Sequence, residues 1–360
     1  MKIFAAVLML MTNSNLILGQ NEFARCAYRL YSSLYYCDFT IYNPRGVNNF
    51  HTINGTHITT SYTDAHVTTV NNLSGSKTTV VPTIICEKFY NLQRVSLCDL
   101  GIEYLNMEID ISFKKCANVL FIELCRNNIS EIPENSFVAS TKLQELNLFD
   151  NGIKNISDYA FINLYNLTTL RLDGNQIVSL SLDLFKPLEN LKMLNLNNNK
   201  IVTLKLQLFQ HLKKLETLHL QRNKITTVVS FDVAVPIYYL YLNENSLKNL
   251  PEKAFNFFQN LNTLHLHNNT FEVIHSDAFA NMPNLRTVRF DNNKINAFDP
   301  YFFNITGVMY LNMTRNLCAN EHIFDNSTSR FSMRVILADC IENYENIGVV
   351  TTTNVTPCNT

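Results

Sequence analysis

Imidazole, phenol and guanidinium side chains recur together in the second half of the chain. They are His219, Tyr238, Tyr239, Tyr241, His265, His267 and Arg289. Histidine can hold a metal ion or transfer protons, whereas tyrosine and arginine are enriched at the dominant positions of protein interfaces. A zinc site needs three or four ligands, and Asp291 is the one carboxylate expected nearby, so we expect no metal. If the group binds a partner, protonation of His219 or His265 at about pH 6 is expected to tune the affinity.

No catalytic pattern accompanies these residues. The sequence contains no Gly-x-Ser-x-Gly elbow, no phosphate-binding glycine loop, no His-Glu-x-x-His and no Cys–His pair suited to catalysis. We therefore expect no enzymatic activity and no cofactor. The net charge of -1, with only 16% charged residues, argues against nucleic acid or an anionic membrane as the main partner. Two interpretations remain: a contact surface for a protein or glycan, or a solvated face whose aromatic side chains contact one another.

An internal repeat predicts the elements that position this group. Copies of one eleven-residue pattern, such as LKMLNLNNNKI, begin at Leu92, Val119, Leu143, Leu167, Leu191, Leu215, Ile237, Leu261, Leu285 and Val308. The pattern Leu-x-x-Leu-x-Leu-x-x-Asn-x-Leu, repeated about every 24 residues, predicts short parallel strands that stack into one core. The third and fifth positions then face outward from a concave sheet. A degenerate copy is expected upstream, with Leu73 aligned 24 residues before Leu97.

Residues at two other positions of the repeat form columns of equivalent side chains along the solenoid, and both columns have expected structural roles. The ninth-position asparagines, such as Asn199, are expected to satisfy backbone groups where the chain leaves the strand. Asn195, at a fifth position, is expected on the concave face instead. A phenylalanine stands six residues before each next copy and should stack with its equivalents along the convex side. These are Phe113, Phe137, Phe161, Phe185, Phe209, Phe231, Phe255, Phe279 and Phe302.

The chain divides into five predicted segments. Residues 1–19 have the charge and apolar run of a secretory signal peptide. An N-terminal cap (20–91), a solenoid (92–318), a C-terminal cap (319–346) and a flexible tail (347–360) follow. No later run is long and apolar enough for a membrane span, so we expect a secreted, extracellular protein. Ten Asn-x-Ser/Thr sites fit this route: Asn54, Asn72, Asn128, Asn155, Asn166, Asn268, Asn304, Asn312, Asn326 and Asn354.

The repeat phase suggests which cysteines pair. Cys98 and Cys125 occupy the seventh position of adjacent copies, within disulfide reach. Cys86 and Cys116 should both point inward from adjacent coils, although two buried free thiols are the alternative. Cys26 with Cys37 would close a small loop in the N-terminal cap, and Cys318 with Cys340 would fasten the C-terminal cap. Cys358 is left over, which suggests a reactive thiol or a disulfide-linked homo- or heterodimer.

The chain resembles the extracellular leucine-rich repeat proteins, which include Toll-like receptor ectodomains and small matrix proteoglycans. The resemblance implies an α/β solenoid: a horseshoe of about ten coils, with a parallel concave β-sheet and Cys-bearing caps. The stretch VVPTIICEKFYNLQRVSL before the first full copy resembles the secreted leucine-rich immune proteins of insects. That resemblance implies recognition of microbial surfaces or immune effector proteins, often in disulfide-linked complexes, although this chain lacks their C-terminal coiled coil. An extracellular matrix or developmental adhesion protein is the alternative, and a soluble receptor decoy is a third.

Overall fold

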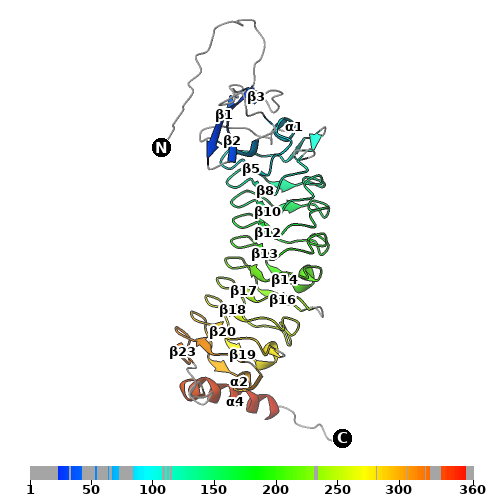
Figure 1. Ribbon diagram of the computed structural model, residues 1–360. Coiled ribbons are helices and arrows are strands. Elements are labelled where there is room, and N and C mark those ends of the chain that lie inside the picture. Colours follow the sequence, from blue (N-terminus) through cyan, green and yellow to red (C-terminus); the bar gives the residue numbers. More distant parts are fainter. Residues whose placement is uncertain are drawn as a thin grey trace, which may run out of the picture.

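The computed structural model shows an elongated, curved stack of coils (Figure 1). It describes residues 23–31, 34–42, 53–54, 64, 67–72, 84–107, 110–111, 113, 116–230, 234–280, 282–305, 307–320, 322–324 and 334–353. The predicted signal peptide and Cys358 lie outside these residues. The N-terminal strands are at one end of the stack and the C-terminal helix at the other.

A single 15-stranded sheet runs through the described part of the molecule. Its central strands are parallel and are β5 (Arg94–Ser96), β8 (Phe121–Glu123), β10 (Glu145–Asn147), β12 (Thr169–Arg171), β13 (Met193–Asn195), β15 (Thr217–His219), β17 (Tyr239–Tyr241), β18 (Thr263–His265), β20 (Thr287–Arg289) and β22 (Tyr310–Asn312). Each strand carries one predicted copy, and equivalent positions pair, as Leu194 does with Leu170 and Leu218. The middle residue of every strand is buried because apolar and polar side chains alternate. The predicted parallel sheet of about ten coils is confirmed.

The ninth-position asparagines form a hydrogen-bonded ladder between coils. Asn199 is 6% exposed. Its Nδ2 donates to the carbonyl oxygens of Leu172 (2.9 Å) and Leu196 (3.1 Å), and its Oδ1 accepts from the backbone N–H of Ile177 (3.0 Å). The other copies repeat this arrangement, for example at Asn127 and Asn293. The predicted structural role of this column is therefore confirmed.

The convex side contains the phenylalanine column. Eight of the nine predicted members are at most 1% exposed, and Phe231 lies outside the described residues. Rings of neighbouring coils meet, as Phe113 and Phe137 do with centroids 5.5 Å apart. The helices there are short: η2 (Leu206–Phe209), η3 (Ser276–Phe279) and α2 (Phe302–Ile305). The solenoid is therefore mainly β rather than α/β in character, because a coil of about 24 residues has little length left for a full helix.

Short outer strands pair in parallel between neighbouring coils. They are β9 (Glu131–Ile132) with β11 (Asn155–Ile156), β14 (Thr203–Lys205) with β16 (Thr227–Val229), and β19 (Val273–Ile274) with β21 (Ala297–Phe298). A separate antiparallel pair, β6 (Asn106–Met107) with β7 (Asp110–Ile111), lies near the N-terminal end of the solenoid.

The N-terminal cap continues the concave sheet. Strands β1 (Phe23–Tyr31) and β2 (Leu34–Tyr42) form an antiparallel pair that Cys26–Cys37 links, and β3 (Ile53–Asn54) pairs with β1. Strand β4 (Val67–Asn72) lies in parallel between β2 and β5. The helix α1 (Ile84–Lys88) precedes β5, and Cys86–Cys116 and Cys98–Cys125 tie the first coils together.

Strand β4 differs slightly from the expected upstream copy. Val70 pairs with Val95, 25 residues later, whereas aligning Leu73 with Leu97 required a separation of 24. The register shifts because Val67 and Val70, both fully buried, take the inward positions. The parallel stack therefore already begins within the segment predicted as a cap.

The C-terminal coil is covered by β23 (His322–Phe324), antiparallel to β22, and by α4 (Ala338–Thr353). The side chains of Leu337 and Cys340 are fully buried, and Cys340 forms a disulfide with Cys318. Helix α4 reaches seven residues into the predicted tail, because a helix anchored by packing extends at little free-energy cost. Among the described residues, four disulfides join the cysteine pairs proposed from the sequence. Among the described residues, no helix is long and apolar enough to cross a membrane.

Candidate binding surface on the concave face

Four neighbouring strands bring the predicted site residues into one row. In the register of β15, β17, β18 and β20, His219 pairs with Tyr241, Tyr241 with His265, and His265 with Arg289. These are fifth-position residues, so all four project from the concave face. Tyr239 lies on the same face of β17, two residues before Tyr241. We call His219, Tyr239, Tyr241, His265 and Arg289 the aromatic row.

Ring contacts fix the side chains of the aromatic row. The rings of His219 and Tyr241 stack with centroids 4.6 Å apart and an interplanar angle of 4°. Tyr241 meets His265 edge to face at 4.9 Å, and His265 meets His267 at 5.5 Å. The ring faces therefore contact one another along the solenoid axis, which leaves ring edges for solvent. The sequence predicted the members of this row, and their ring contacts are those expected for a solvated face with aromatic side chains in contact.

The exposed apolar area of this region comes from two tyrosines. Tyr238 is 43% exposed and Tyr239 is 44% exposed, beside the half-buried Tyr241. His267 differs from the expectation of a contact residue, because its side chain is only 9% exposed and its Nδ1 has no hydrogen-bond partner among the described residues. His267 therefore supports His265 from beneath the surface. The contact area centres on β17.

Burial keeps the histidines neutral. It lowers the pKa of His265 to about 4, with nearby His267 and Arg289 acting in the same direction. Burial also lowers the pKa of His219 and of His267. The expected switch at about pH 6 is therefore wrong for His265, because desolvation penalises its charged form more than a surface imidazole's. The sequence could place this residue on the correct face but could not show how much water its neighbours exclude.

Arg289 is tied back onto the scaffold by a buried carboxylate. Its Nε and Nη2 donate to Asp291 at 2.9 and 2.8 Å, and Asp291 is 4% exposed. Burial alone would raise the pKa of Asp291, but the hydrogen bonds and charge of Arg289 outweigh it and lower the pKa. Arg171 and Asp173 form an equivalent pair, with Arg171 two strands before the aromatic row. Among the described residues, no group of three or more His, Cys, Asp or Glu side chains could hold a metal ion.

Five of the predicted glycosylation sites are exposed among the described residues. The side chains of Asn128, Asn155, Asn166, Asn268 and Asn304 are exposed. Asn312, another of the predicted sites, is only 5% exposed. Its Oδ1 accepts from the backbone N–H and the hydroxyl of Thr314. Asn54 and Asn72 lie in β3 and β4, whereas Asn326 and Asn354 lie outside the described residues.

Comparisons with known proteins agree with this architecture. A family model described as Leucine rich repeat matches residues 118–177, 145–201, 165–225 and 236–295. The crystal structure of the LRIM1/APL1C complex is similar with a TM-score of 0.58 at 18% identity, over 83% of this chain and 56% of that one. The APL1 leucine-rich repeat domain gives 0.58 at 19%, over 82% and 77%. The Drosophila Toll–Spatzle complex gives 0.54 at 22%, over 70% and 37%.

These similarities establish the fold. The chain spans 56% of the length of the LRIM1/APL1C chain it matches. No curated protein sequence matches.

Proposed function

We propose that this chain, a leucine-rich repeat protein, is a secreted binding protein that uses the aromatic row and Tyr238 to hold a protein ligand in innate immune recognition. The observation that carries the proposal is the row itself, in which stacked rings on three adjacent strands flank two exposed tyrosines. A contact surface whose rotamers are already fixed loses little conformational entropy on binding. Tyrosine and arginine are also the residue types that dominate interface energetics.

The orientation of the rings favours a protein over a glycan. A sugar that stacks on an aromatic residue needs a free ring face, and the faces of His219 and Tyr241 are turned toward each other. The row offers ring edges and neutral polar atoms instead, with Tyr238 and Tyr239 as apolar anchors. Such a surface suits a protein segment that inserts apolar side chains between the tyrosines and hydrogen-bonds to the row.

The proposed compartment and role have separate support. Four disulfides favour an oxidising environment, and five exposed glycosylation sites agree with secretion. The similar folds include proteins found in an LRIM1/APL1C complex and in a Toll–Spatzle complex described as a hub of development and innate immunity. We propose recognition of a microbial surface or an immune effector protein by analogy. A disulfide-linked dimer through Cys358 also remains a prediction.

An adhesion function is the second candidate. The leucine-rich repeat protein FLRT2, in an octameric complex with Latrophilin 3 and Unc5D, has a similar fold at 22% identity with a TM-score of 0.51. This chain covers 84% of that one, a larger share than for the immune complexes. A matrix or developmental partner for the same concave surface follows from that similarity.

The test uses secreted protein and two classes of probe. Immobilised wild-type protein is presented with bacteria coated with body-fluid proteins, with peptidoglycan and lipopolysaccharide as glycan probes that should not bind, and separately with collagen. The double variant Tyr239→Ala/Tyr241→Ala should bind at least tenfold more weakly, since each hot-spot truncation costs at least about 2 kcal/mol. The control Thr169→Ala/Arg171→Ala removes the equivalent positions of β12 and should bind like the wild type. Equal loss in both variants, or none in either, contradicts the assignment of the surface, and binding to collagen alone selects adhesion.

A further inference from the structure

Among the described residues, the row of outer strands is interrupted at two coils, one in the middle of the solenoid and one that contains Leu250. Strand β11 pairs with β9 and β14 pairs with β16, but the intervening segment Ser179–Ser181 forms no strand. Strand β14 has the β-branched Thr203 at the position of Ser179, whereas β11 has Asn155 there. This coil has Ser179 and Ser181 instead, and serine favours local bonds to its own backbone over a strand.

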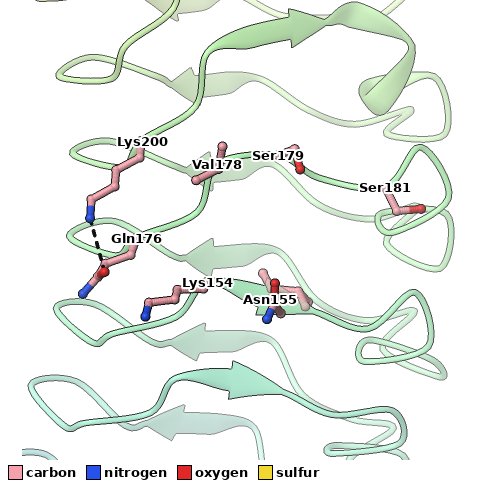
Figure 2. A pocket seen from close by; sticks show the side chains of 8 residues that line it. Lys154, Asn155, Gln176, Val178, Ser179, Ser181 and Lys200 are labelled. Carbon is pink, nitrogen blue, oxygen red and sulfur yellow. Dashed lines mark hydrogen bonds between the residues drawn. The ribbon is translucent and has the colours of Figure 1, made fainter.

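The interruption opens a cavity on each side of the segment. The first, of about 410 Å³, lies between Asn155 and Ser179, and its lining combines polar groups with the apolar Ile156 and Val178 (Figure 2). The second, of about 290 Å³, lies between Leu180 and Leu204 and is lined mostly by apolar side chains. Val178 and Ser179 line both cavities, so the two share a wall. Together they reach the volume range of small-molecule sites, about 300–1,000 Å³.

The second cavity extends into the hydrophobic core. Its lining includes Leu196, Phe209 and Leu220, all fully buried. Val178 and Val202, which also line this cavity, are exposed, so a thin, flexible hydrocarbon chain can lie against them above the buried side chains. Burying each methylene of such a chain would contribute about 0.8 kcal/mol.

The first cavity carries an unbalanced positive charge. Lys154 and Lys200 line it, and neither forms an ion pair with a described carboxylate. Figure 2 shows Lys200 reaching to the neighbouring coil, where its Nζ donates to Gln176 Oε1 at 3.2 Å. Lys205 lines the second cavity, and neither lining contains an Asp or Glu. The pair of cavities is therefore complementary to a ligand with an anionic head and an apolar tail.

We propose that this interrupted coil binds a single-chain fatty acid as its anion. The carboxylate lies in the first cavity between the ammonium groups of Lys154 and Lys200. The hydrocarbon chain crosses Val178 and lies in the second cavity beside Leu180 and Val202. The site is on the outer side of the coil, away from the concave face, so it is independent of the aromatic row.

The test measures binding of 11-(dansylamino)undecanoate to glycosylated, secreted protein. The chain has no tryptophan, so dansyl emission on direct excitation reports the probe alone. Decanoate should displace the probe, 1-decanol should be at least about tenfold weaker for lack of the head charge, and acetate should not compete. Lys154→Glu/Lys200→Glu should weaken probe binding about tenfold, as expected for two exposed ion pairs of up to about 1 kcal/mol each. Lys224→Glu, at the position equivalent to Lys200 one coil later, is the matched control.

A second variant tests the cavity for the hydrocarbon chain separately from the lysines that bind the carboxylate. Val178 is 51% exposed, so Val178→Glu should fold normally while placing a charge on the shared wall. It should abolish probe binding with an unchanged circular dichroism spectrum. The proposal is overturned if the probe does not bind, if 1-decanol competes as well as decanoate, or if Lys224→Glu weakens binding as much as the lining variant. Binding that appears only after enzymatic removal of glycans also overturns it, because the Asn155 glycan would then cover the site.

Discussion

Replacing Asn199 by leucine tests the hydrogen-bonded ladder that holds the coils together. Leucine has the same number of side-chain heavy atoms as asparagine and the same branch at Cγ but cannot hydrogen-bond. The carbonyl of Leu172 would keep its bond from Asn175, and that of Leu196 its bond from Asn223, because each carbonyl accepts from two coils. The backbone N–H of Ile177, fully buried, would lose its Asn199 partner and have no other.

The expected magnitude follows from that one orphaned group. An unsatisfied buried donor costs about 1–3 kcal/mol, and the two weakened carbonyls add to it. The free energy of unfolding of Asn199→Leu should therefore be about 1–3 kcal/mol lower than that of the wild type. Urea denaturation followed by circular dichroism gives this value. Hydrogen exchange localises the effect, because the Ile177 amide should exchange faster than amides several coils away.

The same substitution four residues earlier is the control. Asn195 is half-buried, and its Oδ1 accepts one bond, from the backbone N–H of Asn197 at 3.1 Å. That amide lies at the exit of the strand, so Asn195→Leu should cost less than about 1 kcal/mol. Equal losses in the two variants, or unchanged exchange at Ile177, would refute the assigned role of the ladder.

Three other perturbations test separate parts of the structure. Gly174 has φ +70°, and an added Cβ would lie 3.2 Å from the Asp150 backbone. Gly174→Ala should therefore lower the free energy of unfolding by about 1–2 kcal/mol. An unchanged urea midpoint would contradict this prediction. Removing the Cys98–Cys125 bond, which spans 27 residues, with two serines should cost roughly 3 kcal/mol while leaving binding at the concave face intact. His265 has a folded-state pKa of about 4, below that of the unfolded chain. The unfolded state therefore binds its proton first, and stability should fall as pH decreases from about 6.5 to 4. When urea midpoints are measured against pH, the decrease at low pH should be smaller for His265→Gln than for the wild type. Parallel pH profiles of the two proteins would show that His265 is not responsible for the decrease.

The sequence predicted much of the architecture because a repeat of fixed length makes equivalent residues into neighbours. The phase of Cys98 and Cys125, the column that contains Asn199, and the row from His219 to Arg289 all follow from counting along the chain. No long-range contact has to be guessed, since each coil packs on the next. The register of β4 shows the limit: where the leucine pattern fades, the inward valines decide the pairing.

Burial and backbone pairing required the tertiary structure. The neutral state of His265 depends on water excluded by rings from neighbouring coils, a sum over contacts that no single position encodes. Asn312 matches a glycosylation pattern but is buried by the final coil and Thr314. The cavities beside Ser179 exist because one segment does not pair with its neighbours, and that outcome depends on the balance of local and inter-coil hydrogen bonds. The repeat therefore determines which residues meet, and three-dimensional packing determines which of them water can reach.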